Sequence, residues 1–154
     1  MRRKDTILIL DDDCSAHEAM EEVFTRDVQD AGLRFLCPRF TDPGEEADYH
    51  DSFFRNEKRL AATVDMINTE RARIGLLVLD TSMPDIDLQK DFGSLQLNRL
   101  PLWLWSIMDY GPKEQLELME YYANKGFNNF ENFITKNHMR DHGMPMILER
   151  FKKL

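Results

Sequence analysis

The sequence predicts an α/β protein built on an open, doubly wound parallel sheet. Its apolar residues gather in short continuous runs, which are typical of strands covered on both faces. Segments with helical spacing separate these runs, and this alternation implies parallel strands joined by right-handed crossovers. Polar residues follow directly after four of the runs, and in such a sheet ligands bind at the carboxyl ends of the strands.

The apolar runs are the predicted strands. In chain order, the four buried ones are Thr6–Leu10, Gly75–Leu79, Pro101–Trp105 and Phe133–Thr135. A fifth strand, predicted near Leu33–Cys37, has its apolar residues on one face of an extended chain. Pro38 cannot donate a hydrogen bond to a neighbouring strand, so this strand should lie at an edge of the sheet.

Two helices are predicted before the strand that ends at Asp80. Ser15–Glu18 has the form of a capping box and opens the first helix, which Gly32 is expected to stop. The second helix has apolar residues at helical spacing on one face, namely Leu60, Ala61, Val64 and Ile67. Together they predict strand–helix–strand units at the start of the chain.

Two further helices are predicted in the second half of the chain. Gly111 and Pro112 are typical of a helix start, and this helix is expected to end at Gly126. The final helix is predicted to begin near Pro145 and to run to the chain end. Its buried face would carry Ile147, Leu148 and Phe151.

Residues 41–56 form an acidic, turn-rich region between the predicted edge strand and the second helix. The region also carries Tyr49, Phe53 and Phe54, which is unusual for a flexible linker. We expect an ordered insertion whose aromatic side chains either pack on the domain or bind a partner.

Length and composition indicate one domain spanning residues 1–154, of which 42% are hydrophobic. The formal net charge of −8, without a long Lys/Arg-rich run, argues against direct binding to nucleic acid. No apolar stretch approaches the ~20 residues of a membrane span, so we expect no membrane partner and a cytoplasmic location. Cys14 and Cys37 lack the number and spacing of a disulfide framework or a zinc site.

The polar residues at the ends of the four buried runs are the candidate site. They are Asp11, Asp12 and Asp13, then Asp80, Ser106 and Lys136. Clustered carboxylates repel one another, and a hard divalent cation with oxygen ligands, Mg²⁺ above all, relieves this repulsion. With the metal bound, one carboxylate is a suitable nucleophile toward phosphorus. Lys136 and Ser106 then offer a cation and a hydroxyl to the phosphoryl oxygens.

The same residues resemble the receiver domain of two-component response regulators. The matching segments, in family order, are Ile7–Asp12, Asp80–Pro84, Leu100–Ser106 and Phe133–Lys136. The resemblance covers roughly residues 6–154. Within the family, the chain is similar to stand-alone, chemotaxis-type receivers. It implies a flavodoxin-like sheet of five parallel strands in the order 2-1-3-4-5.

The resemblance also implies roles for the candidate residues. The implied Mg²⁺ ligands are Asp11, Asp12, Asp80 and, through its backbone carbonyl, Ser82. Asp80 would be the phosphoacceptor, Ser106 the switch hydroxyl and Lys136 the phosphate partner. The implied function is a signalling module and not an enzyme, beyond self-phosphotransfer and self-dephosphorylation. Its partners would be a histidine kinase or histidine phosphotransfer protein and a downstream protein.

The chain departs from the receiver pattern at several positions. Ile107 follows Ser106 where receivers carry a small residue, and Asn137 stands in place of the usual proline. Asp85–Leu88 replaces a stretch that usually contains glycine, and the insertion at residues 41–56 lengthens the chain before Asp80. These departures leave open a pseudo-receiver, which binds proteins without being phosphorylated. A metal-dependent phosphatase on a similar sheet fits less well, because no second acid is placed as a general acid.

Overall fold

The computed structural model describes residues 4–11, 29–38, 57–81, 88–106 and 108–152 of the chain. Within this part there are five strands: β1 (Thr6–Leu10), β2 (Arg34–Leu36), β3 (Ile74–Asp80), β4 (Leu102–Ser106) and β5 (Phe130–Thr135). They form one parallel sheet in the order β2-β1-β3-β4-β5. The predicted fold class and strand order are therefore confirmed, and β2 lies at the edge, as the sequence predicted.

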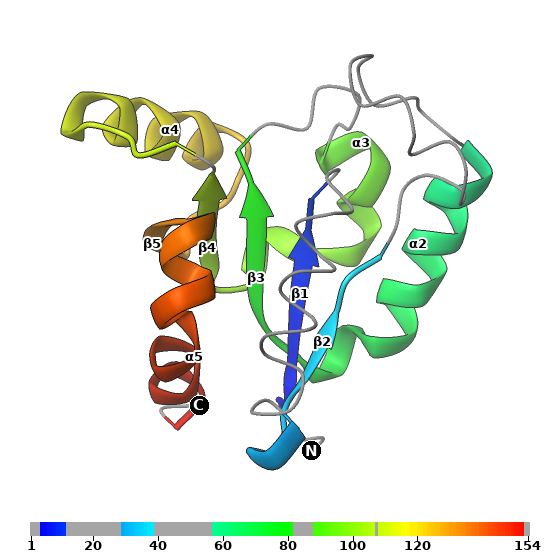
Figure 1. Cartoon of the computed structure of the whole chain (residues 1–154). Coiled ribbons are helices and arrows are strands. Elements are labelled where there is room, and N and C mark those ends of the chain that lie inside the picture. Colours follow the sequence, from blue (N-terminus) through cyan, green and yellow to red (C-terminus); the bar gives the residue numbers. More distant parts are fainter. Residues whose placement is uncertain (1–3, 12–28, 39–56, 82–87, 107, 153–154) are drawn as a thin grey trace, which may run out of the picture.

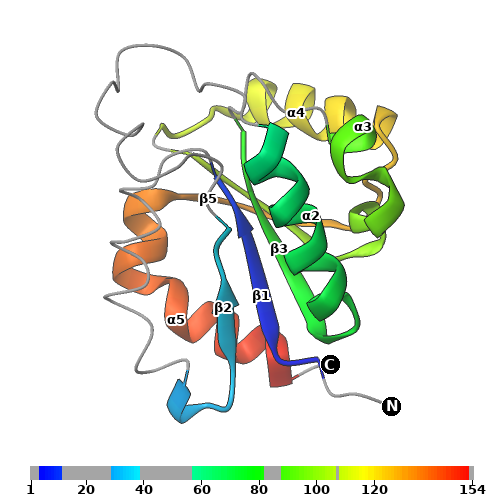
Figure 2. The same ribbon diagram turned by 90° about the vertical axis from the view of Figure 1, so that its right-hand side faces the viewer.

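Helices cover both faces of this sheet (Figures 1 and 2). They are α2 (Glu57–Glu70), α3 (Leu88–Phe92), α4 (Pro112–Asn124) and α5 (Lys136–Lys152), with short 3₁₀ turns at Arg71–Arg73, Gly93–Leu95 and Leu97–Arg99. Figure 2 shows α2, α3 and α4 on one side of the sheet and α5 on the other. Among the described residues, no helix is long and apolar enough to cross a membrane.

The core consists of two layers, because alternate residues of each central strand face opposite sides of the sheet. Leu8 and Leu10 of β1 pack into the layer that contains Leu60 of α2. Ile7 and Ile9 pack into the opposite layer, which includes Ile147 of α5. Burying each such side chain contributes on the order of 1.5–3 kcal/mol. Strands buried on both faces explain why the apolar runs are continuous.

Glycines end two helices where the sequence predicted them to. Gly32 has a φ of +74° after helical residues Gln29 and Asp30, and Gly126 has a φ of +91° just after α4. Both are left-handed conformations that glycine adopts without a steric penalty. The capping box at Ser15–Glu18 lies outside the described residues.

The buried face of α2 differs from the prediction at one position. Leu60 and Ile67 are buried as expected, and Val64 is half-buried. Ala61, however, is exposed, and Thr63 takes its place with 2% of its surface accessible. On a helix, residue 63 lies beside 60 and 67, whereas residue 61 is rotated by about 100° from 60. Alanine is small enough to occur on either the buried or the exposed face of a helix, so Ala61 did not indicate which face is buried.

The prediction that the last helix begins near Pro145 was wrong. The helix α5 begins at Lys136, and Pro145 lies inside it on the exposed surface. The hydroxyl of Thr135 accepts a hydrogen bond from the backbone N–H of His138 at 3.0 Å, which is a helix N-cap. Buried Met139 and Ile147 hold the two halves of α5 on the same core layer, and this packing outweighs the helix-breaking tendency of proline.

Candidate functional site

Four of the candidate side chains come together at one edge of the sheet. Asp11 follows β1, Asp80 ends β3, Ser106 ends β4 and Lys136 follows β5. The strands are parallel, so their carboxyl ends meet at one edge, toward which the arrowheads of β1, β3 and β4 point in Figure 1. The predicted convergence of these four residues is therefore a feature of the fold.

Lys136 lies between the two acidic residues of this edge. Its Nζ is 2.7 Å from Oδ2 of Asp11 and 3.6 Å from Oδ2 of Asp80. The side chains of Lys136, Asp11 and Asp80 are 11%, 0% and 9% exposed. A buried carboxylate is costly unless a cation or hydrogen bonds compensate it, so the ammonium stabilises both acids at once. These three groups together still carry one net negative charge.

The ring of Trp105 lies next to the lysine ammonium. Lys136 Nζ lies 5.3 Å from the centroid of this fully buried ring, in a cation–π arrangement. Sequence reasoning placed Trp103 and Trp105 in the core, which is confirmed by their exposures of 4% and 0%. The second role of Trp105 was missed, because nothing in the local sequence indicates that Lys136 reaches over β4.

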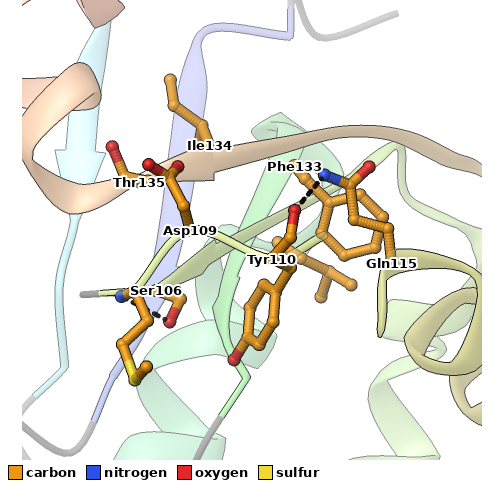
Figure 3. A pocket seen from close by; sticks show the side chains of 9 residues that line it. Ser106, Asp109, Tyr110, Gln115, Phe133, Ile134 and Thr135 are labelled. Atoms are coloured by element: carbon orange, nitrogen blue, oxygen red, sulfur yellow. Dashed lines mark hydrogen bonds between the residues drawn. The ribbon is translucent and has the colours of Figure 1, made fainter. Parts of the chain in front are cut away.

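Ser106 is 8% exposed and its hydroxyl contacts the loop that follows β4. Its Oγ accepts a hydrogen bond from the backbone N–H of Met108 at 3.1 Å (Figure 3). Beside it is a cavity of about 40 Å³ whose walls include Tyr110 and Phe133. Such a cavity holds water-sized groups and is far below the ~300 Å³ of a small-molecule site. The cavity beside Ser106 therefore leaves room for a small movement of side chains but not for a large ligand.

A pair of hydroxyl groups, from Thr81 and Tyr110, lies next to Asp80. Thr81, the residue after it, pairs through Oγ1 with the Tyr110 hydroxyl at 2.7 Å. On α4, burial raises the pKa of the Tyr122 hydroxyl well above its usual range, and the charges of Tyr121, Asp80 and Tyr110 add to the effect. Tyr122 thus remains protonated across the physiological pH range. Sequence reasoning missed these tyrosines, because spacing alone does not bring a loop or helix residue to a strand end.

Two residues of the predicted metal site, Asp12 and Ser82, lie outside the described residues. Ile107 and the predicted insertion at 41–56 lie outside them as well. Within the described part, no group of three or more acidic, histidine or cysteine side chains surrounds a common point. The donors that are described fit Mg²⁺ in kind. Asp11 and Asp80 supply the hard carboxylate oxygens that Mg²⁺ prefers.

Comparison with known proteins supports the fold. No family model and no curated protein matches the sequence. The structure is similar to the signal receiver domain of a protein assigned as the response regulator NarL from Mycobacterium tuberculosis, with a TM-score of 0.55 and 16% identity. The match covers 99% of this chain and 100% of that domain. A pilus assembly-related protein from Burkholderia pseudomallei K96243 also matches, at a TM-score of 0.43 and 16% identity over 96% of this chain and 91% of that one. The first likeness shows that this chain has the receiver-domain fold.

Proposed function

We propose that the protein is a receiver module that accepts a phosphoryl group on Asp80 from a histidine kinase or a histidine phosphotransfer protein. The observation that carries the proposal is the position of Lys136 between the carboxylates of Asp11 and Asp80. The three groups lie at the ligand-binding edge of a sheet with the receiver strand order. A buried lysine shared by two acids is costly to maintain, and phosphoryl transfer gives a reason to keep it.

The geometry supports a division of roles. The side chain of Asp80 is 9% exposed and lies at the sheet edge, from which a phosphoryl donor would have to reach its carboxylate. An oxygen of Asp80 would form the new bond to phosphorus while the phosphorus–nitrogen bond of the donor phosphohistidine breaks, and the leaving imidazole takes up a proton. Lys136 would then stabilise the phosphoryl oxygens through its ammonium group, and Ser106 through its hydroxyl.

Mg²⁺ would be held by Asp11, Asp12, Asp80 and the backbone carbonyl of Ser82. When bound, the ion would compensate the negative charge of the carboxylates and of the incoming phosphoryl group. The described residues suit this role in kind, because Asp11 and Asp80 both lie within reach of the same lysine and offer carboxylate oxygens.

The direct test is phosphorylation by acetyl phosphate with Mg²⁺, followed by intact mass. The wild-type protein is expected to gain about 80 Da, the mass of one phosphoryl group that replaces a proton on the nucleophile. Asp80→Asn should abolish the gain. Asp65→Asn is a matched control, because Asp65 is exposed on α2 and should leave the gain intact. Equal labelling of the wild type and Asp80→Asn would refute Asp80 as the acceptor.

A pseudo-receiver is the second candidate, and one observation favours it. Lys136 contacts both described carboxylates, so their charge is partly compensated without a metal. If the folded wild type takes no phosphoryl group but Ile107→Ala does, the branched side chain of Ile107 blocks a working site. If neither is modified, the module acts through protein contacts, and residues 41–56 become the first place to look for them.

We further propose that the signal leaves through the face formed by α4, β5 and α5. Large apolar side chains are exposed on α4 and on the loop before it: Met108 at 70%, Leu116 at 56% and Met119 at 40%. Exposed groups of this kind favour contact with another protein. If α4 responds to phosphorylation, its backbone amides should change their hydrogen exchange on treatment with acetyl phosphate, whereas those of α2 should not.

A further inference from the structure

The loop between β4 and α4 is joined to the end of β3 by side chains outside the predicted site. Thr81 Oγ1 and the Tyr110 hydroxyl are 2.7 Å apart, and both residues are half-buried. Thr81 directly follows Asp80, so the bond connects the loop to the residue next to the proposed phosphoacceptor. The backbone of Thr81 is held as well, since its N–H donates a hydrogen bond to the Trp105 carbonyl at 3.2 Å.

Tyr110 is also held on two other sides, as Figure 3 shows. Its carbonyl accepts a hydrogen bond from Nε2 of Gln115, in the first turn of α4, at 2.9 Å. Its ring meets the ring of Phe133 on β5 edge to face, with centroids 6.4 Å apart. One tyrosine thus links the end of β3, the strand β5 and the first turn of α4.

Ser106 is engaged by the same loop. Its Oγ accepts the N–H of Met108 at 3.1 Å, and the cavity of about 40 Å³ separates Ser106 from the rings of Tyr110 and Phe133. Rotation of the Ser106 side chain toward a phosphoryl group on Asp80 would break its hydrogen bond from the Met108 N–H. This would free the loop that carries Met108 to shift, and the hydrogen bond between Tyr110 and Thr81 would oppose that shift.

We propose that the Tyr110–Thr81 hydrogen bond is a latch that holds the loop in its unphosphorylated arrangement and thereby slows phosphorylation of Asp80. The inference rests on the proposed function and adds a regulatory residue to it. A neutral hydrogen bond contributes about 0.5–1.5 kcal/mol, which corresponds to a shift of about two- to tenfold in the balance between the two loop states. The rate of phosphorylation follows the population of the competent state.

The test compares the latch variants Tyr110→Phe and Thr81→Val, which remove one hydroxyl each and retain the shape of the side chain. Each is expected to speed labelling by acetyl phosphate and Mg²⁺ about two- to tenfold, the range set by one hydrogen bond. The double variant should be no faster than the faster single variant, because both changes break the same bond. Tyr121→Phe is the matched control: Tyr121 is 53% exposed on α4, and its variant should label at the wild-type rate.

A second readout needs no phosphorylation. Amides at residues 108–115 should exchange faster in Tyr110→Phe than in the wild type, while amides of β1 and β3 should be unchanged. This separates a released loop from general loss of stability. The latch would be overturned if the single variants were labelled no faster than the wild type. It would also be overturned if the rate increases of the two single variants multiplied in the double variant.

The outcomes also distinguish the latch from the proposed function. If the wild type is labelled on Asp80 and Tyr110→Phe is labelled at the same rate, the latch fails and the receiver function stands. If neither protein is labelled, the receiver function fails, and the regulatory role of Tyr110 fails with it.

Discussion

Among single residues, Lys136 has the largest influence on the candidate site. Its ammonium lies 2.7 Å from Asp11 and 3.6 Å from Asp80, and its position is supported by the ring of Trp105. An exposed ion pair contributes little to stability, but a buried pair that loses one partner leaves a charge in a poor environment. The lysine therefore influences folding as well as the proposed chemistry.

We predict that Lys136→Met destabilises the protein by about 3 kcal/mol, because two buried carboxylates lose their shared cation. Urea unfolding would measure this as a lower midpoint with an unchanged slope. Lys113→Met is the control, since Lys113 is exposed on α4 and its loss should have little effect. Adding Asp11→Asn to Lys136→Met should recover part of the loss, because one of the two repelling charges is removed. An unchanged midpoint in Lys136→Met would show that other groups compensate the acids.

At the scale of secondary structure, α5 combines features that rarely occur together in one helix. It contains Gly143 and Pro145, yet it is continuous from Lys136 to Lys152. The side chain of Met139 lies over Gly143, so that an added Cβ would collide with its sulfur. The far end is tied back to β5, where Arg150 Nε donates to Glu131 Oε1 at 2.7 Å. Tertiary contacts along its length thus maintain a helix of low intrinsic propensity.

Two substitutions in α5 should change stability in opposite directions. Pro145→Ala restores a backbone donor at an exposed position and should stabilise the protein by about 1–3 kcal/mol. Gly143→Ala should destabilise it, although alanine favours helices by up to about 1 kcal/mol over glycine, because the new methyl group displaces Met139. In a Met139→Ala background, Gly143→Ala should become stabilising. Thermal unfolding of the four variants would test this, and a stabilising Gly143→Ala in the wild type would contradict the packing argument.

For the whole molecule, the ligand-binding edge joins strands that are far apart in sequence. Asp11 follows β1, Asp80 ends the neighbouring strand β3, and Lys136 begins the last helix. A ligand that binds all three recognises the assembled sheet and has no equivalent site in the unfolded chain. Binding at this edge is therefore linked to the stability of the whole domain.

We predict that Mg²⁺ raises the unfolding temperature, and that the rise continues as the ion concentration exceeds its dissociation constant. Removal of the ion by a chelator should reverse the effect. In Asp11→Asn the stabilisation by Mg²⁺ should be lost, whereas Asp65→Asn should respond like the wild type. Tryptophan fluorescence offers a second measure, since Trp105 touches Lys136 and should report its movement, while Trp103→Phe should leave that response in place. No response of either measure would count against a metal-dependent receiver.

The sequence by itself determined the parallel sheet and where the described candidate residues lie on it. Continuous apolar runs can be buried only between two layers, and a polar residue after such a run must emerge at the strand end. Asp11, Asp80, Ser106 and Lys136 could therefore be placed at one edge without a structure. These are local consequences of chain direction and burial, so they can be read from adjacent residues.

Only the tertiary structure decided which side chains meet across elements. The position of the Lys136 ammonium over Trp105 and the bond between Thr81 and Tyr110 each join segments that are distant in sequence. The same holds for Thr63, which is buried in place of Ala61 because of what packs against α2. The proline favoured a helix that begins near Pro145, but burial of residues on both sides of it contributes more free energy than the lost hydrogen bond costs.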